Sequence, residues 1–294
     1  MHDAAESGRT VLMSGASGRI PDCVLMKRPG TALGAWGVLR GEFGFKSGQS
    51  GAHAARTMML GDLTTLLRTA PEAAKRADFE RLIVEENVLG KRTTSNRRLT
   101  ARHLVDLYAL DPSVTVFRLL RFFWDADAQS RPMLALLCSQ SRDPLFRLSA
   151  RRVLETSVGE TLTSGDFVDF FSRELPGRFS EAMTLSLAQN IAASWAQAGF
   201  FKGKVNKVRT RPVVTPATGA YALALGYLCG LRGQLLLESD WARLLDVPRD
   251  QVIRLAQEAS RRGWLDFKGV GNVFEVTFRQ LLTPVEIKAS HGPD

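Results

Sequence analysis

The stretch that decides the fold runs from Ser239 to Phe278 and reads SDWARLLDVPRDQVIRLAQEASRRGWLDFKGVGNVFEVTF. Apolar residues recur in its centre at the i, i+3, i+4, i+7 spacing of one helix face: Val252, Leu255, Ala256 and Ala259. Pro248 stands where a helix tolerates proline, in its first turn, and Gly263 stands just beyond the expected end. We therefore expect a helix between these two residues.

The flanking residues predict further elements. Ser239 is a suitable cap for a short helix that contains Trp241, and residues 220–231 form a longer apolar helix. After Gly263, residues 264–268 and 273–278 read as strands joined by a glycine turn. Three helices followed by a glycine-rich hairpin are typical of a winged helix. We expect this unit over residues 213–284, with residues 285–294 as a tail.

A helical body is expected upstream, over residues 56–212. Leucine and aromatic residues recur there at helical spacing, and the run from Val116 to Trp124 is apolar on nearly every side, which predicts a helix at the centre of the core. Residues 1–55 are rich in glycine and serine and have no period, so a disordered extension is expected. The predicted fold class is therefore mainly α, with a multi-helix body, a winged helix and a small β-hairpin.

Charge and composition restrict the function. The chain has 294 residues and a formal charge of +9, which favours polyanionic partners such as DNA or RNA. No apolar run approaches the roughly 20 residues that span a bilayer, and no secretory pattern opens the sequence. The three cysteines lie far apart, which fits a reducing compartment. A cytoplasmic protein without a membrane partner is expected.

One basic cluster lies between Val88 and Val105, a segment without any acidic residue. Its cations are Lys91, Arg92, Arg97, Arg98 and Arg102. A predicted helix start with small hydroxyl residues beside these cations is a suitable phosphate site. The alternative is a solvated loop and helix face.

A second basic cluster lies at the end of the body, within residues 182–237, which also lack acids. Its candidate contacts are Lys202, Lys204, Lys207, Arg209 and Arg211. Phe200 and Phe201 precede them and could stack on a base or anchor the loop to the core. The alternative interpretation of the segment is a flexible basic linker.

The predicted third helix of the winged unit supplies the remaining candidates. Arg249, Gln251 and Arg254 should point outward from its N-terminal half, where such helices enter the major groove. Arginine and glutamine can each pair with a base edge through two hydrogen bonds. Many winged helices bind only proteins, so docking of a protein partner stays open.

No motif indicates catalysis. Residues 11–20 read VLMSGASGRI, which imitates a dinucleotide-binding turn, but Pro21 and a glycine-rich run follow where the helix should begin. The four histidines show no metal-ligand spacing, and we find no nucleophile elbow. We expect no catalytic residue, no metal, no cofactor, no small-molecule substrate and no enzyme.

Three segments resemble the BrxA family of BREX phage-exclusion systems. They are residues 86–93 (ENVLGKRT) with Ser95, Arg97 and Arg98; residues 142–147 (RDPLFR); and residues 195–200 (WAQAGF). The resemblance covers roughly residues 60–215. It implies a helical DNA-binding accessory protein of a bacterial defence operon, packed like the antitermination factor NusB, with no catalytic residues. By this resemblance Lys91, Arg92, Arg97 and Arg98 match a basic, polar segment of the family.

The leading hypothesis is therefore a DNA-binding component of a phage-defence assembly that contacts the phosphate backbone with little sequence preference. Its partners would be DNA, with RNA as an alternative, and other defence proteins. Two other hypotheses remain. One is a stand-alone winged-helix transcription regulator, and the other is a protein-interaction scaffold.

Overall fold

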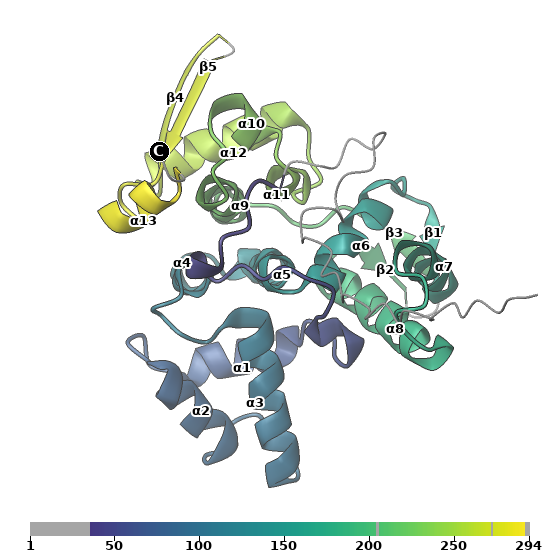
Figure 1. The fold of residues 1–294 in the computed structure, drawn as a ribbon. Helices are drawn as coiled ribbons and strands as arrows, with labels where there is room; N and C mark the ends of the chain where they lie inside the picture. The colour runs from purple at the N-terminus through teal and green to yellow at the C-terminus, as the bar shows by residue number, and fades with distance from the viewer. Residues whose placement is uncertain (1–35, 204–205, 272, 292–294) are drawn as a thin grey trace, which may run out of the picture. The chain divides into compact units, whose positions relative to one another are not determined.

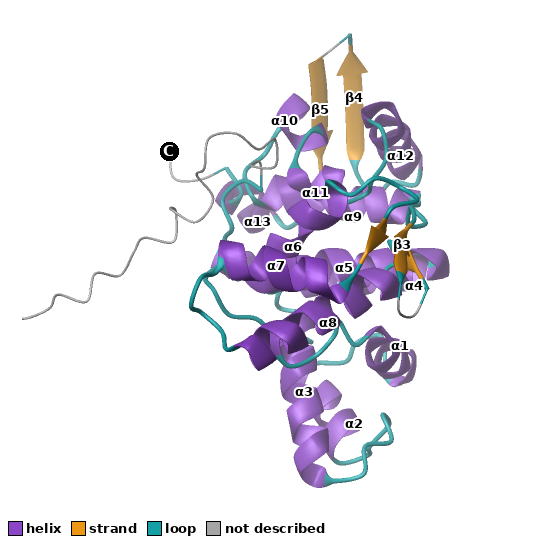
Figure 2. Ribbon diagram, turned by 90° about the vertical axis from the view of Figure 1, so that its right-hand side faces the viewer, coloured by secondary structure: helices purple, strands orange, loops and turns teal. Residues whose placement is uncertain are grey.

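A computed structural model describes residues 36–203, 206–271 and 273–291. It is mainly helical, with small antiparallel sheets (Figures 1 and 2). The helices up to residue 197 are α1 (Leu60–Thr69), α2 (Arg76–Val84), α3 (Thr94–Tyr108), α4 (Thr115–Ala126), α5 (Arg131–Arg142), α6 (Pro144–Leu154), α7 (Ser164–Glu174) and α8 (Glu181–Gln197). Single 3-10 turns are η2 (Gly41–Phe43), η3 (Ala52–Ala54) and η4 (Ala128–Ser130).

The C-terminal region has more elements than the sequence predicted. Its helices are α9 (Pro216–Leu228), α10 (Gly233–Leu237), α11 (Asp240–Arg243), α12 (Arg249–Arg261) and α13 (Pro284–Ala289). Strands β4 (Asp266–Val270) and β5 (Val273–Thr277) form the expected antiparallel hairpin after α12. Helix α10 was not predicted, and the expected tail contains α13, whose Glu286 carboxylate pairs with Arg118 of α4.

Side-chain caps explain several helix starts. The Thr93 hydroxyl accepts a hydrogen bond from the backbone N–H of Asn96, so α3 begins at Thr94. Ser239 caps α11 in the same way, as its sequence position predicted. Pro248 precedes the first residue of α12 and serves as its N-cap.

Helices α5 and α9 form the centre of the core. Every residue from Met133 to Arg142 in α5 is buried, and so is every residue from Ala217 to Leu228 in α9. The predicted central helix, α4, packs beside both of them but leaves Phe122 exposed. The small residues of α9 allow close approach on all sides, and the hydroxyl of its Tyr221 donates to the Val116 carbonyl at 2.9 Å.

This packing removes the expected boundary near residue 212. Helix α9 belongs to the predicted winged unit, yet it packs against α4 and α5 of the body. By its internal contacts, the chain from Leu33 to Asp294 forms one compact unit. The two predicted domains therefore share a core.

The expectation of a disordered extension to residue 55 differs from the structure over residues 36–55. We call residues 36–58 the N-terminal strap; Trp36, Phe43 and Phe45 of the strap are buried. The Trp36 ring meets Trp241 edge to face, with 4.6 Å between centroids, and the Trp241 indole N–H donates to the Trp36 carbonyl at 3.0 Å. These anchors are too widely spaced to produce a period. The rest of the predicted extension, residues 1–35, lies outside the described residues.

The predicted basic loop after α8 is partly a sheet. Strands β2 (Phe201–Lys202) and β3 (Lys207–Arg209) pair with each other and with β1 (Thr161–Leu162), in the order β1-β3-β2. A flexible linker is therefore the wrong description of these residues. The pairing joins segments far apart in the sequence, and each strand is too short to show alternation.

Candidate nucleic-acid interface

Helix α12 lies on α9 through its predicted apolar stripe. Val252, Leu255, Ala256 and Ala259 are all buried. Leu255 approaches Gly219 of α9 so closely that a Cβ atom on Gly219 would stand 2.9 Å from the Leu255 Cβ. Glycine at this position therefore sets the depth at which α12 rests on the core.

The opposite face of α12 is polar and open. Arg254, Gln257 and Arg261 are exposed and Gln251 is half-buried. Neither Arg254 nor Arg261 has an ion-pair partner among the described residues. Two hydrogen-bonding cations are thus held on a rigid helix and face solvent, and nearby Asp250 and Glu258 lower the net charge of this face.

Arg249 does not share this open position. Its Nε atom lies 3.4 Å from a Glu238 carboxylate oxygen, and its guanidinium lies over the Phe274 ring at 5.3 Å. The side chain therefore ties the start of α12 to the hairpin and to the end of α10. The sequence predicts Arg249 as a DNA contact; in the structure the side chain is half-buried and its charge is partly balanced by Glu238.

The hairpin tip is apolar rather than basic. Val270 and Val273 are 84% and 77% exposed, and they face solvent next to Gly271. On the strands, Lys268 lies 3.9 Å from Glu275, so its charge is partly balanced.

The cluster at the start of α3 divides into structural and exposed cations. Lys91 pairs with Asp62 at 2.9 Å, and Arg97 donates to the carbonyls of Lys91 and Val84. These two predicted contacts hold the turn between α2 and α3. The exposed cations are Arg92, Arg98 and Arg102.

The cluster around β2 and β3 divides in the same way. Arg209 is buried, donates to the Val153 carbonyl at 3.2 Å, pairs with Asp246 at 2.8 Å and lies over the Phe200 ring. It cannot contact a phosphate, because its guanidinium is enclosed. The aromatic rings of this segment, Phe200 and Phe201, are buried and therefore anchor it to the core instead of stacking on bases.

The remaining residues of this cluster have different exposures. Lys202 and Arg211 are exposed, and Lys207 is half-buried. Lys204 lies outside the described residues. Because Asp246 directly precedes the α12 region, the pair with Arg209 ties this small sheet to the turn that leads into α12.

The predicted contacts do not form one surface. Helix α12 packs on α9, α9 packs on α5, and α5 packs on α3. Figures 1 and 2 accordingly show β4 and β5 at one end of the unit and α2 and α3 at the other. The exposed arginines of α3 and those of α12 therefore belong to separate regions.

Sequence reasoning missed a buried chain of polar groups that joins three distant segments. The His53 ring lies between Asp143 and Ser194, with Nδ1 at 2.8 Å from the carboxylate and Nε2 at 3.0 Å from the hydroxyl oxygen. All three side chains are 0–1% exposed. No sequence motif could reveal this arrangement, since the residues lie on the strap, before α6 and in α8.

The order of groups matches a Ser-His-Asp triad, but the surroundings are those of a structural network. The Ser194 hydroxyl accepts a hydrogen bond from the Met58 N–H at 2.8 Å and lies 2.7 Å from the Asn190 carbonyl, to which it donates. A catalytic serine needs access to substrate, whereas this oxygen is enclosed. Burial opposes ionisation of Asp143, but the charge and hydrogen bonds of His53 outweigh it and lower the pKa of that carboxyl.

Residues 142–147, which carry part of the BrxA resemblance, hold the N-terminal strap. Arg142 donates to the Gly44 carbonyl and Arg147 to the Lys46 carbonyl, each at 2.6 Å. Asp143 accepts the His53 backbone N–H at 2.9 Å and caps α6 through the N–H groups of the following turn. The polar residues of this segment therefore act in folding.

No family model and no curated protein matches the chain. Within the described ranges, no group of three or more His, Cys, Asp or Glu side chains could hold a metal ion. In the same part of the chain, no helix has both the length and the apolar character needed to cross a membrane.

Proposed function

We propose that residues 213–284 form a winged-helix unit that binds duplex DNA through α12, without a catalytic step. The observation that carries this proposal is the orientation of α12. Its apolar stripe is buried against α9, which leaves Arg254 and Arg261 unpaired on the outer face, beside the β4–β5 hairpin. In winged helices, the helix in this position enters the major groove and the hairpin lies near the backbone.

The chemistry of the outer face supports contact with a polyanion. Arg254 and Gln251 are of the residue types that bind base edges or phosphates, while Asp250 and Glu258 limit the attraction. Lys202, in β2, and Arg211, two residues after β3, belong to the segment tied to the turn before α12, where they would contact phosphates. We therefore propose binding dominated by the backbone, with little sequence preference.

The resemblance to BrxA extends this proposal to a biological setting. By this resemblance, the chain would be a DNA-binding accessory protein of a phage-defence assembly, with a helical body packed like NusB. Within residues 142–147 of that resemblance, Arg142 and Arg147 bind the chain's own backbone, so we propose no DNA contact for them.

Salt-dependent titration of two unrelated duplexes tests the proposal. Each phosphate contact contributes about −0.9 to the slope of log affinity against log salt concentration. The double change Lys202→Glu and Arg211→Glu should make the slope shallower by roughly 2 and weaken both duplexes alike. Arg173→Glu, on exposed α7, is the matched control and should leave the slope unchanged.

The outcomes separate backbone contact from base reading. If Arg254→Ala weakens both duplexes equally, α12 contacts the backbone; if it weakens only one, by roughly 1–3 kcal/mol, α12 reads a base. A slope near zero in the unmodified chain would contradict DNA binding altogether.

The hairpin tip supports a second candidate, a protein-interaction scaffold. Val270 and Val273 are exposed at the hairpin tip. In a DNA-binding wing, cations at these positions would bind the phosphates more strongly. In this case, Val270→Lys and Val273→Lys should abolish complex formation with a defence partner. Enhanced duplex binding by the same variant would instead favour the DNA proposal.

A further inference from the structure

A hollow between α2 and α3 combines an apolar floor with unpaired arginines. It has a volume of about 240 Å³. Phe79 and Ile83 of α2 and Leu110, just after α3, line it with buried side chains, while Val84 and Val105 are half-exposed in it. The hollow therefore offers apolar surface to a ligand at the end of the unit opposite the β4–β5 hairpin (Figures 1 and 2).

Three arginines stand around this floor. Arg76 is at the start of α2, and Arg98 and Arg102 are one turn apart on α3. All three are exposed, and none has a carboxylate within ion-pair distance in the described part of the chain. Like charges at i, i+4 destabilise a helix slightly, so an anion beside Arg98 and Arg102 would relieve their repulsion.

The backbone at this edge is held in an unusual conformation. Ala109 and Leu110, between α3 and α4, both have positive φ, at 67° and 50°. Non-glycine residues rarely adopt such angles, and they persist where the surroundings enforce them. Here the conformation keeps Leu110 against the floor of the hollow.

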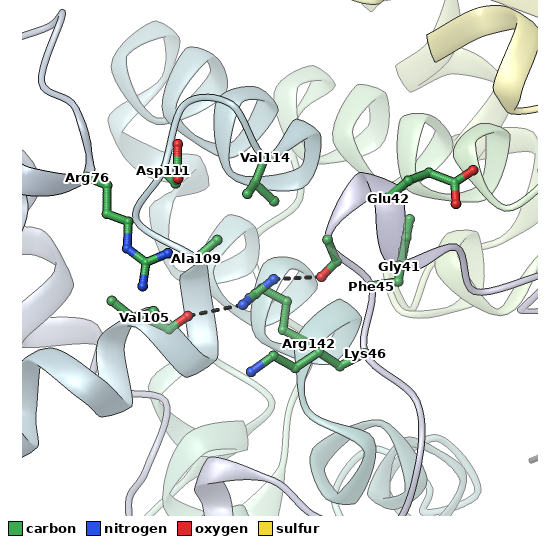
Figure 3. Close-up of a pocket in the computed structure, with 11 residues that line it drawn as sticks. Gly41, Glu42, Phe45, Lys46, Arg76, Val105, Ala109, Asp111, Val114 and Arg142 are labelled. Atoms are coloured by element: carbon green, nitrogen blue, oxygen red, sulfur yellow. Dashed lines mark hydrogen bonds between the residues drawn. The ribbon is translucent and has the colours of Figure 1, made fainter. Parts of the chain in front are cut away.

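The neighbouring hollow of about 260 Å³ does not share this charge pattern (Figure 3). Arg76 lines both hollows, and Figure 3 shows its side chain extending toward Ala109. Arg142 in the second hollow is already engaged by backbone carbonyls, and Glu42 and Asp111 add negative charge. Of these two hollows, the one between α2 and α3 is the better match for an anionic ligand.

We infer that the hollow between α2 and α3 docks an acidic, amphipathic helical segment of a partner protein. The apolar floor would receive one or two hydrophobic anchors, and Arg98 and Arg102 would pair with acids one turn apart on the partner. Nucleic acid fits less well, because its phosphates gain nothing from the apolar floor. This site is independent of the proposed DNA contact by α12.

Fluorescence polarisation with a defined probe tests this inference. The probe is a labelled helical peptide with Phe and Leu one turn apart, flanked by Glu residues. The unmodified chain should bind it. Arg98→Glu with Arg102→Glu should raise Kd by about tenfold or more, because two charge pairs become repulsive. Arg173→Glu, an exposed change on α7, should not alter Kd.

Changes to the probe separate charge from apolar contact. Replacing its Glu residues with Gln, or its Phe and Leu with Ser, should each weaken binding. Circular dichroism of the Arg98→Glu, Arg102→Glu variant checks that it is folded, and Arg98→Gln with Arg102→Gln provides a milder change with the same expected direction.

Two results would overturn the inference. One is that the probe binds no better than its Gln or Ser versions, or is indifferent to the arginine changes. The other is that duplex DNA displaces the probe from the unmodified chain and the arginine changes weaken DNA as strongly as the probe. The second result would assign the hollow to nucleic acid.

Discussion

Replacing His53 with alanine should destabilise the protein strongly at neutral pH. The change removes the 2.8 Å contact with Asp143, the 3.0 Å contact with Ser194 and the stack on Phe146, whose ring centroid is 4.1 Å away. The Asp143 carboxylate would keep only backbone N–H donors while remaining buried. A buried carboxylate that loses its side-chain partner in this way is left as an uncompensated charge, which costs about 3–5 kcal/mol.

That loss is a large fraction of the stability of an ordinary protein, which is about 5–15 kcal/mol. Urea unfolding followed by circular dichroism at pH 7 measures it as a lower midpoint. His103→Ala is the matched control. His103 is also a buried histidine, but its Nδ1 atom has no hydrogen-bond partner, so its removal leaves no carboxylate behind and should cost less.

The pH dependence of this stability loss shows whether the Asp143 carboxylate causes it. In the unmodified protein, the pKa of Asp143 is lowered, so its stabilising contribution is complete above the unfolded value of about 3.9 and is lost as pH falls below it. Without His53, burial dominates and should raise that pKa. In the folded variant, Asp143 would then take up a proton on acidification. The difference in unfolding free energy between the variant and the unmodified protein should therefore shrink as pH falls.

Two results would refute this reasoning. The first is a midpoint for His53→Ala equal to that of the unmodified protein at pH 7. The second is a stability difference that grows as pH falls. Either would mean that the buried chain of polar groups does not hold the strap to α6 and α8.

Two further predictions concern neighbouring positions. Gly51→Ala should destabilise the strap severely, because the added Cβ would stand 1.9 Å from an Asp143 carboxylate oxygen; thermal unfolding checks this, and an unchanged Tm would show that the strap moves freely. His103→Gln should reduce the loss of stability on acidification below about pH 6.5, since burial, assisted by Arg56 and Arg102, lowers the pKa of His103 and the unfolded chain binds the proton first. Unfolding midpoints between neutral and mildly acidic pH test it, and parallel curves for the two proteins would contradict it.

Local patterns predicted the local elements of this chain. The apolar stripe from Val252 to Ala259 and the flanking Pro248 and Gly263 predicted α12, because helix periodicity and end signals reside in adjacent residues. The β4–β5 hairpin was predicted from local signals as well, namely two strand-like segments joined by a glycine turn. The β1–β3–β2 sheet could not be predicted, because it joins segments of two or three residues from distant parts of the chain.

The strap was missed for a related reason. Trp36, Phe43 and Phe45 are isolated in a glycine-rich segment, and each finds its partner far away in the sequence. Composition alone indicated disorder there. The partners that hold the strap, Arg142 and Arg147, entered the sequence analysis only as part of the BrxA-like segment 142–147, and nothing in the sequence linked them to the strap.

Because several arginines are buried, the net charge overstates the positive charge that is available at the surface. Arg142, Arg147 and Arg209 lie inside and donate to backbone carbonyls. Burial lowers the pKa of Arg147 to about 10, so this side chain stays charged at neutral pH and depends on those oxygens. A formal charge of +9 therefore includes cations that no polyanion can reach.

The cations that remain exposed must be distinguished by what lies beside them. On α12, Arg254 stands among Gln251 and Gln257, a polar surface able to hydrogen-bond with bases and phosphates. On α3, Arg98 and Arg102 border a floor that includes Ile83 and Leu110. This apolar floor favours binding of an apolar side chain, because both surfaces are then removed from water. Charge is similar in the two places, and it would attract both kinds of partner. The surface between the cations differs, and because of that difference we propose nucleic acid as the ligand at one end of the unit and a protein segment as the ligand at the other.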